Sequence, residues 1–194
     1  MSSAETAAAG PAGAAAPGTP DEQGAPRTVL RDMRWWDMDA VIALEQELFP
    51  EDAWSRGMFW SELADTRHPG AGRRYVVAEQ TGPDGRPPRI VGYAGFSAVA
   101  GTGDVQTIAT ARDQWGTGLG ARLLTELLRA ATAAECHEVL LEVRVDNARA
   151  QRLYTRFGFE PVGVRRGYYQ PGNVDALVMR LADPARDYPP VQEG

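Results

Sequence analysis

The chain has 194 residues, of which 43% are hydrophobic and 24% charged, values typical of a soluble globular protein with one domain of ordinary size. Its formal net charge of -6 argues against a nucleic-acid-binding protein, because such proteins usually carry a basic face. The single cysteine, Cys136, excludes an internal disulfide framework, and the lack of a signal peptide or of an apolar run of about 20 residues predicts a cytoplasmic protein without a membrane segment.

Both ends of the chain have the composition of unstructured segments. Ala, Gly and Pro occupy 17 of the first 26 positions, and no aromatic residue is present there to anchor a core. The last residues are similarly polar and rich in proline. We therefore expect a disordered leader over residues 1–26, one folded domain over residues 27–182 and a flexible tail over residues 183–194.

The folded part is predicted to begin with a short strand, over residues 27–33, and two helices. Asp37 is a candidate N-cap for the first helix, which Phe49-Pro50 would end because proline disfavours helix for the residue before it. Ser55 is a candidate N-cap for the second helix. Three strands are then expected, the first two as a hairpin, over residues 74–79, 89–98 and 104–110.

A strand, a leucine-rich helix and another strand are predicted at the centre of the chain. The helix, over residues 118–133, carries leucines at the 3.6-residue period, so one of its faces should pack on a sheet. Residues 139–145 are apolar at most positions, which predicts a central strand covered on both faces. Asn147 should begin a further helix, followed by strands over residues 162–169 and 175–181. This order predicts a mixed α/β fold with helices on the faces of its sheet.

Three glycines alternate at positions 116, 118 and 120, directly before the leucine-rich helix. Exposed N–H groups, the positive end of a helix and the lack of Cβ atoms would suit a pyrophosphate. The segment is not a P-loop, because no Gly-Lys-Ser/Thr follows, and it lacks the spacing of a dinucleotide-binding fingerprint. On the glycines alone, a plain flexible turn before a helix is an equally good interpretation.

Glu142 and Tyr154 are the candidate catalytic residues. Glu142 lies in an otherwise apolar strand, where desolvation would raise the pKa of its carboxyl group toward that of a useful general base. The structural alternative is an ion pair with Arg144 or with a neighbouring strand. Tyr154 lies on the apolar face of the next helix, either as a core residue with a satisfied hydroxyl or as a proton donor. His68 and His137 are isolated, so no metal site is expected.

Together these features resemble the GCN5-related N-acetyltransferase (GNAT) superfamily over nearly all of residues 27–182. The segment Trp115-Gly116-Thr117-Gly118-Leu119-Gly120 is similar to the family's Q/R-x-x-G-x-G/A loop, with tryptophan where glutamine or arginine is usual. Leu141-Glu142-Val143-Arg144, Asn147 and Leu153-Tyr154 resemble the ribosomal-protein alanine N-acetyltransferases within the superfamily. The resemblance implies a GNAT fold, with one mixed, mostly antiparallel sheet of about seven strands and about four helices on its faces.

The resemblance also implies roles for individual residues. Acetyl-CoA would be the co-substrate, Glu142 the general base and Tyr154 the acid that protonates the departing thiolate. The residues implied to contact acetyl-CoA are Ile108, Ala109, Thr110, Trp115, Gly116, Thr117, Gly118, Leu119, Gly120 and Asn147. The residues implied to line the entrance for a peptide are Phe49, Pro50, Tyr168 and Tyr169.

The implied reaction is transfer of acetyl to the N-terminal amine of a protein, with the alanine of small ribosomal subunit protein eighteen as the first candidate. The chemistry is consistent, because an α-amine with a pKa of about 7.7–8.0 loses its proton more easily than a lysine at about 10.4. The alternatives are acetylation of a lysine or a small amine, a non-catalytic CoA-binding or scaffold module, and a nucleotide-binding α/β protein. Nucleic acid and membrane are not expected partners, and the oligomeric state stays open.

Overall fold

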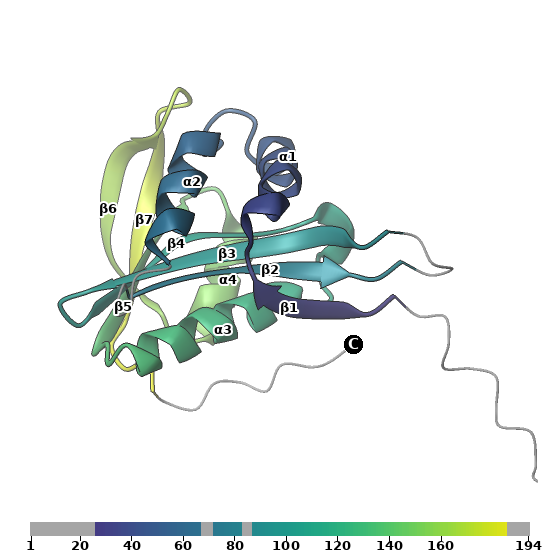
Figure 1. Ribbon diagram of the computed structural model, residues 1–194. Helices are drawn as coiled ribbons and strands as arrows, with labels where there is room; N and C mark the ends of the chain where they lie inside the picture. The colour runs from purple at the N-terminus through teal and green to yellow at the C-terminus, as the bar shows by residue number, and fades with distance from the viewer. Residues whose placement is uncertain (1–25, 67–71, 83–86, 186–194) are drawn as a thin grey trace, which may run out of the picture.

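A computed structural model describes residues 26–66, 72–82 and 87–185 of the chain (Figure 1). Apart from Pro26, the predicted leader lies outside the described residues, as do His68 and the predicted tail from residue 186 onward. No helix in the described ranges is long and apolar enough to cross a membrane.

The strands and helices follow one another in the predicted order. The elements are β1 (Thr28–Asp32), α1 (Met38–Leu48), α2 (Arg56–Asp65), β2 (Arg73–Gln80), β3 (Arg89–Val99), β4 (Thr102–Thr110), α3 (Leu119–Ala133), β5 (Glu138–Arg144), α4 (Ala148–Arg156), β6 (Glu160–Tyr169) and β7 (Val174–Leu181). Two short 3₁₀ helices, η1 (Trp35–Asp37) and η3 (Arg112–Gln114), are additional to the prediction.

All the described strands form one seven-stranded sheet in the order β1-β2-β3-β4-β5-β7-β6. Neighbouring strands are antiparallel except β4 and β5, which run parallel. The predicted mixed, mostly antiparallel sheet is therefore confirmed. The parallel pairing is short, since residues 102–105 of β4 pair with residues 138–141 of β5 and the later residues of the two strands do not pair. The sheet thus divides at one point along its length.

An irregularity in β4 coincides with this division. The register with β3 shifts between Gly95 and Phe96, which leaves Gln106 as an extra residue in β4 directly after Val105. Such a bulge bends its strand and increases the local twist. The Gln106 side chain is fixed from β2, because the Tyr75 hydroxyl donates a hydrogen bond of 2.6 Å to its Oε1 atom. β4 is therefore bent at the residue where its pairing with β5 ends.

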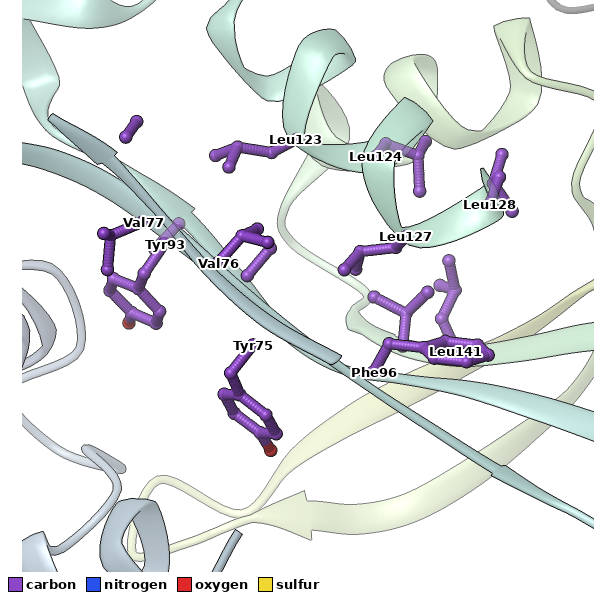
Figure 2. Packing of buried hydrophobic residues seen from close by; sticks show 14 of the residues in the cluster. Tyr75, Val76, Val77, Tyr93, Phe96, Leu123, Leu124, Leu127, Leu128 and Leu141 are labelled. Carbon is purple, nitrogen blue, oxygen red and sulfur yellow. The ribbon is translucent and has the colours of Figure 1, made fainter. Parts of the chain in front are cut away.

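Helices cover both faces of the sheet, with α3 on one face and α1 and α2 on the other (Figure 1). The predicted leucine stripe of α3 is confirmed and faces the sheet. Figure 2 shows Val76 and Phe96 on the same side of the sheet as these leucines, whereas Tyr75 and Tyr93 point to the opposite side. The buried leucines of the stripe are Leu119, Leu123, Leu124, Leu127 and Leu128.

The prediction that β5 is covered on both faces is wrong. Val139, Leu141 and Val143 are buried, whereas the alternate residues Glu142 and Arg144 are only partly covered. The helices on that side of the sheet lie elsewhere, because α1 packs mainly on β3 and α2 on β2. One face of β5 therefore carries polar side chains that a ligand can reach.

The predicted N-caps have different outcomes. Ser55 caps α2 as predicted, since its hydroxyl accepts a hydrogen bond of 3.3 Å from the Met58 N–H group. Asp37 occupies the N-cap position of α1 as predicted, but its side chain makes no capping hydrogen bond because its carboxylate is engaged elsewhere. It pairs with Arg31 at 2.7 Å and accepts a hydrogen bond of 2.8 Å from the Arg34 N–H group, which stabilises η1 instead.

A buried carboxylate anchors the loop between α1 and α2. Glu45 is 2% exposed and accepts hydrogen bonds from the Trp54 N–H group, at 2.8 Å, and from the Tyr93 hydroxyl. Burial raises the pKa of Glu45 to about 7, with the charge of Asp52 acting in the same direction. Asp52 also pairs with Arg144 at 3.5 Å, so the loop is tied both to β3 and to the end of β5.

Replacing Glu45 by glutamine should change how stability depends on pH. The folded-state pKa lies near 7 rather than at the ordinary 4.5, so wild-type stability is fully present below about pH 4.5 and is lost as the pH rises through 7. Glutamine keeps the shape without titrating. The free energy of unfolding of Glu45→Gln relative to wild type should therefore rise by about 2 kcal/mol between pH 5 and pH 8, measured by urea unfolding. Parallel pH profiles for the two proteins would contradict the assignment.

Candidate active site

A cleft of about 1210 Å³ lies where β4 and β5 separate. Its walls are the ends of these strands, the loop before α3, the helix α4 and the loop between α1 and α2. Glu142, Tyr168 and Tyr169 are not among its lining residues. The other predicted site residues all line it, namely Phe49, Pro50, Ile108, Ala109, Thr110, Trp115, Gly116, Thr117, Gly118, Leu119, Gly120, Asn147 and Tyr154.

β4 presents an unpaired backbone edge to this cleft. The Ala111 N–H group donates a hydrogen bond of 2.8 Å to the Val91 carbonyl of β3. Because successive residues of a strand bond to opposite sides, the peptide groups of Ile108 and Thr110 point away from β3, toward the side from which β5 has diverged. The Thr110 carbonyl accepts a hydrogen bond of 3.1 Å from the Trp115 indole. Ile108 therefore keeps a donor and an acceptor for an extended amide ligand.

The glycine loop forms a backbone cradle at the start of α3. Gly116 and Gly118 have φ angles of 84° and 86°, in the left-handed region that favours glycine. A Cβ atom on Gly116 would meet nothing within 4 Å, so the loop is open to the cleft. The helical hydrogen bonds begin with the Arg122 N–H group, which donates to the Gly118 carbonyl at 3.0 Å. The N–H groups of the preceding turn have no acceptor inside the helix and suit an anion.

Asn147 serves as the N-cap of α4, which confirms that a helix begins there. Its Oδ1 atom accepts a hydrogen bond of 3.1 Å from the Ala150 N–H group. α4 lies beside the start of α3, because a Cβ atom on Gly120 would stand 3.4 Å from the Leu153 side chain. The two helix N-termini therefore flank the same cleft.

Glu142 forms an ion pair, which was the structural alternative considered from the sequence, but its partner is neither Arg144 nor a residue of an adjacent strand. Its carboxylate is 18% exposed and lies 3.1 Å from the Arg165 guanidinium of β6. Arg144 pairs instead with Asp52, at 3.5 Å, and with Asp146, at 3.1 Å. Because the Arg165 side chain is 57% exposed, its pair with Glu142 contributes little to stability. Another cation, such as an ammonium group, can replace it.

A second carboxylate, which sequence reasoning missed, lies within electrostatic reach of Glu142. Burial and the charge of Glu142 raise the pKa of Asp104 on β4 to about 6, while Arg165 acts in the opposite direction. The sequence contained a weak signal, since Asp104 is an acidic residue at the start of a predicted strand. Its proximity to β5 follows from the parallel pairing of the two strands, which composition does not reveal.

Tyr154 lies at the cleft with its hydroxyl available. The side chain is buried, and its ring packs at 5.9 Å from the ring of Phe159. Within the described part of the chain, no group forms a hydrogen bond with this hydroxyl. Burial raises the pKa of Tyr154 above its ordinary value, so the group keeps its proton at neutral pH. It can therefore donate a hydrogen bond to a ligand.

The predicted peptide-entrance residues lie around Glu142 and the mouth of the cleft. The Tyr169 hydroxyl donates a hydrogen bond of 3.4 Å to the Glu142 carbonyl, and the Tyr168 ring packs on Tyr169 at 5.1 Å. A Cβ atom on Gly172 would lie 3.1 Å from the Glu51 carboxylate, so the turn between β6 and β7 meets the loop between α1 and α2. The structure thus brings the two predicted halves of the entrance together.

The described residues include no group of three or more His, Cys, Asp or Glu side chains that could hold a metal ion. The groups suited to a bound molecule are those of the cleft: a backbone edge, a glycine loop at a helix end and a tyrosine hydroxyl. This set fits an elongated ligand that carries amides and phosphates.

Comparison with known proteins gives the same picture. The acetyltransferase (GNAT) family model matches residues 34–159. N-alpha-acetyltransferase RimI of Mycobacterium tuberculosis is 38% identical over 149 residues, which are 74% of this chain and 85% of that protein. The ribosomal protein bS18-alanine N-acetyltransferase of Salmonella typhimurium is 33% identical over 149 residues, which are 75% of this chain and 90% of that protein.

Among solved structures, the crystal structure of the ribosomal-protein-S18-alanine N-acetyltransferase from Escherichia coli superposes with a TM-score of 0.64 and 26% identity. The match covers 83% of this chain and 97% of that one. From the family match and these relatives, the chain belongs to the GNAT family and is an N-acetyltransferase.

Proposed function

We propose that the protein transfers acetyl from acetyl-CoA to the N-terminal α-amine of a protein, with the alanine of ribosomal protein bS18 as the first candidate. The observation that carries this proposal is the separation of β4 and β5, which places a free backbone edge, a glycine loop and the Tyr154 hydroxyl around one cleft beside Glu142. The names of the relatives support the acceptor class. We expect the protein to act in the cytoplasm.

Successive parts of the cleft suit successive parts of the CoA molecule. The free peptide groups of Ile108 suit an amide of the pantetheine arm, which would lie along β4 as an added strand does. The loop from Gly116 to Gly120 suits the pyrophosphate, because the N–H groups and the positive end of α3 face it. When bound, acetyl-CoA supplies a thioester carbon that an amine can attack.

Glu142 would accept the proton that the attacking amine loses. The incoming substrate is an ammonium ion, and it can take the place of the Arg165 guanidinium that pairs with Glu142. The ammonium first gives one proton to water, which frees the nitrogen lone pair, and an α-amine pKa of about 7.7–8.0 makes this loss easy near neutral pH. As the neutral nitrogen forms the new N–C bond and the C–S bond breaks, its second proton passes to this carboxylate, directly or through water, and the sulfur leaves as thiolate. No covalent intermediate on the protein is required.

Tyr154 would stabilise the departing sulfur. A thiol has an ordinary pKa of about 8.5, and burial raises the pKa of Tyr154 above the ordinary tyrosine value of 10.0. A hydrogen bond from the hydroxyl to the thiolate is therefore favoured over complete transfer of the proton. Tyr154 would therefore act as a preorganised hydrogen-bond donor at the position where negative charge develops on the sulfur.

The peptide assay that tests the acceptor class compares two substrates. One peptide begins with a free alanine, and the other is blocked at its N-terminus and contains a lysine. We expect mass spectrometry to find acetyl on the free α-amine only, since that amine loses its proton more easily. The chain contains no lysine, so its own N-terminus is the one amine on the enzyme that could compete. Acetylation of the blocked peptide alone would establish a lysine acetyltransferase, and binding of CoA without any transfer would favour a scaffold.

Replacing Glu142 by glutamine should lower kcat by about 10²- to 10⁴-fold while the Kd for CoA stays the same. Glu138→Gln is the matched control, because Glu138 lies on the same strand and face but pairs with Arg180 at 3.7 Å, away from the cleft. Turnover that survives in Glu142→Gln but disappears in Asp104→Asn would transfer the role of base to Asp104.

The glycine backbone, rather than the Trp115 side chain, should dominate binding of the pyrophosphate. Gly118 has a φ angle of 86°, which proline cannot adopt because its ring fixes φ near −65°. We expect Gly118→Pro to weaken CoA binding by more than about tenfold and Trp115→Ala to weaken it less, as measured by calorimetry. Melting temperatures close to that of wild type confirm that the variants are folded. The reverse order of the two effects would refute this account of the loop.

A further inference from the structure

One face of α4 carries a row of arginines that the proposed chemistry does not use. Arg149, Arg152 and Arg156 are spaced three and four residues apart, so they lie along one side of the helix. All three are exposed and line the cleft. In the described ranges no carboxylate forms an ion pair with any of them, whereas Arg144 in the same cleft has two acidic partners. A chain with a net charge of -6 thus gathers unpaired positive charge at one wall.

Trp115 holds the first of these arginines in place. The Arg149 guanidinium lies 3.8 Å from the centre of the Trp115 ring, and the indole is itself fixed by its hydrogen bond to the Thr110 carbonyl. Stacking covers the face of a guanidinium and leaves the N–H groups at its edge free. The Arg112 guanidinium lies 5.4 Å from the same ring. Two cations therefore share one aromatic platform, an arrangement that an anion would stabilise.

The pKa of Arg149 also indicates that an anion would stabilise this cluster of cations. Burial lowers the pKa of this guanidinium, and the charge of Arg112 acts in the same direction. The negative charge of a bound anion would act on this pKa in the opposite direction. The pyrophosphate is already provided for by the N–H groups of the adjacent glycine loop, which leaves the arginines for a different anionic group.

CoA carries such a group, a third phosphate on the 3′-hydroxyl of its ribose. Trp115 directly precedes the glycine loop, and the arginine row leads away from Trp115 along α4 for about 10 Å. We propose that Arg149, Arg152 and Arg156 form a subsite for this 3′-phosphate, and that Trp115 is the positioning residue that presents Arg149. The proposal rests on the proposed function only in that CoA is the ligand.

A comparison of two ligands on two proteins isolates the phosphate contact. Titration calorimetry at an ionic strength of about 0.1 M gives the Kd of CoA and of 3′-dephospho-CoA for wild type and for Arg149→Ala/Arg152→Ala. We expect wild type to bind CoA about tenfold more tightly than dephospho-CoA, and the ratio to fall to within about twofold of one in the double variant. Arg129→Ala, which removes a charge from α3 outside the cleft, should keep the wild-type ratio.

The role of Trp115 is tested with the same ratio of the Kd values of CoA and 3′-dephospho-CoA. Trp115→Phe keeps an aromatic platform and should keep most of the discrimination, whereas Trp115→Ala should lower it toward that of the double variant. An equal loss of discrimination between the two ligands in Trp115→Phe and Trp115→Ala would show that the aromatic ring does not position Arg149. Circular dichroism and melting temperature establish that each variant is folded.

Three results would overturn the subsite. Equal weakening of both ligands in the double variant would assign the arginines to the pyrophosphate. Equal affinity of wild type for both ligands would leave the 3′-phosphate without a subsite. A double variant with unchanged ligand ratios but a raised KM for the acceptor peptide would make this row an acceptor surface. Because binding is read without acetyl transfer, a chain that discriminates the ligands but acetylates no N-terminal peptide would refute the proposed function alone, and a chain that binds neither ligand would refute both.

Discussion

The loss of pairing between β4 and β5 is the constraint on which the rest of the structure depends. A sheet that continues unbroken satisfies its backbone groups with its own strands, and buried peptide groups left without partners cost free energy. Here the parallel pairing ends after four residues in each strand, and β4 continues with one side open. The bulge at Gln106, whose side chain is fixed by Tyr75, lies where this pairing ends, while β3 pairs with β4 on both sides of the bulge. The opening is therefore held by the fold rather than by a mobile segment.

Electrostatic contacts connect this opening to the elements around it. Glu45 and Asp52 tie the loop between α1 and α2 to β3 and to the end of β5, and Tyr169 connects β6 to the backbone of Glu142. Acidic and basic side chains lie at different places around the cleft. Two carboxylates, Asp104 of β4 and Glu142 of β5, lie near each other where an ammonium substrate would arrive, and unpaired arginines gather on α4, where a polyanionic cofactor would extend. The cleft thus presents opposite charge to each of two proposed ligands.

Local patterns in the sequence account for much of the fold. The leucine period of α3, the cap at Ser55 and the glycine turn each depend on residues close together in the chain, and each appears as predicted. The prediction for Asp37 was only half right, although its partners are also close in the chain. Asp37 stands at the N-cap position of α1, but its carboxylate binds Arg31 and the Arg34 N–H group instead of an N–H group of the helix.

The failures at the site have a different origin, because they involve segments that are far apart in the chain or in the sheet. The coverage of β5 is decided by where α1 and α2 pack, which the hydrophobicity of the strand does not contain. The partner of Glu142 is Arg165, on a strand that is not adjacent to β5 in the sheet. Trp115 stands where the family usually has glutamine or arginine, and its stacking with Arg149 becomes visible only when α4 is placed beside the loop.

The central claim is that the divided edge of β4 and the glycine loop together receive acetyl-CoA. Amide hydrogen exchange with and without acetyl-CoA tests it most directly, because each amide reports on its own hydrogen bond. The account predicts that acetyl-CoA slows exchange at Ile108 and at the amides from Gly116 to Ala121, while amides of β4 already bonded to β3, such as Thr107 and Ala109, change little. Unchanged exchange at Ile108 and in the loop, with protection appearing elsewhere on the molecule, would contradict it.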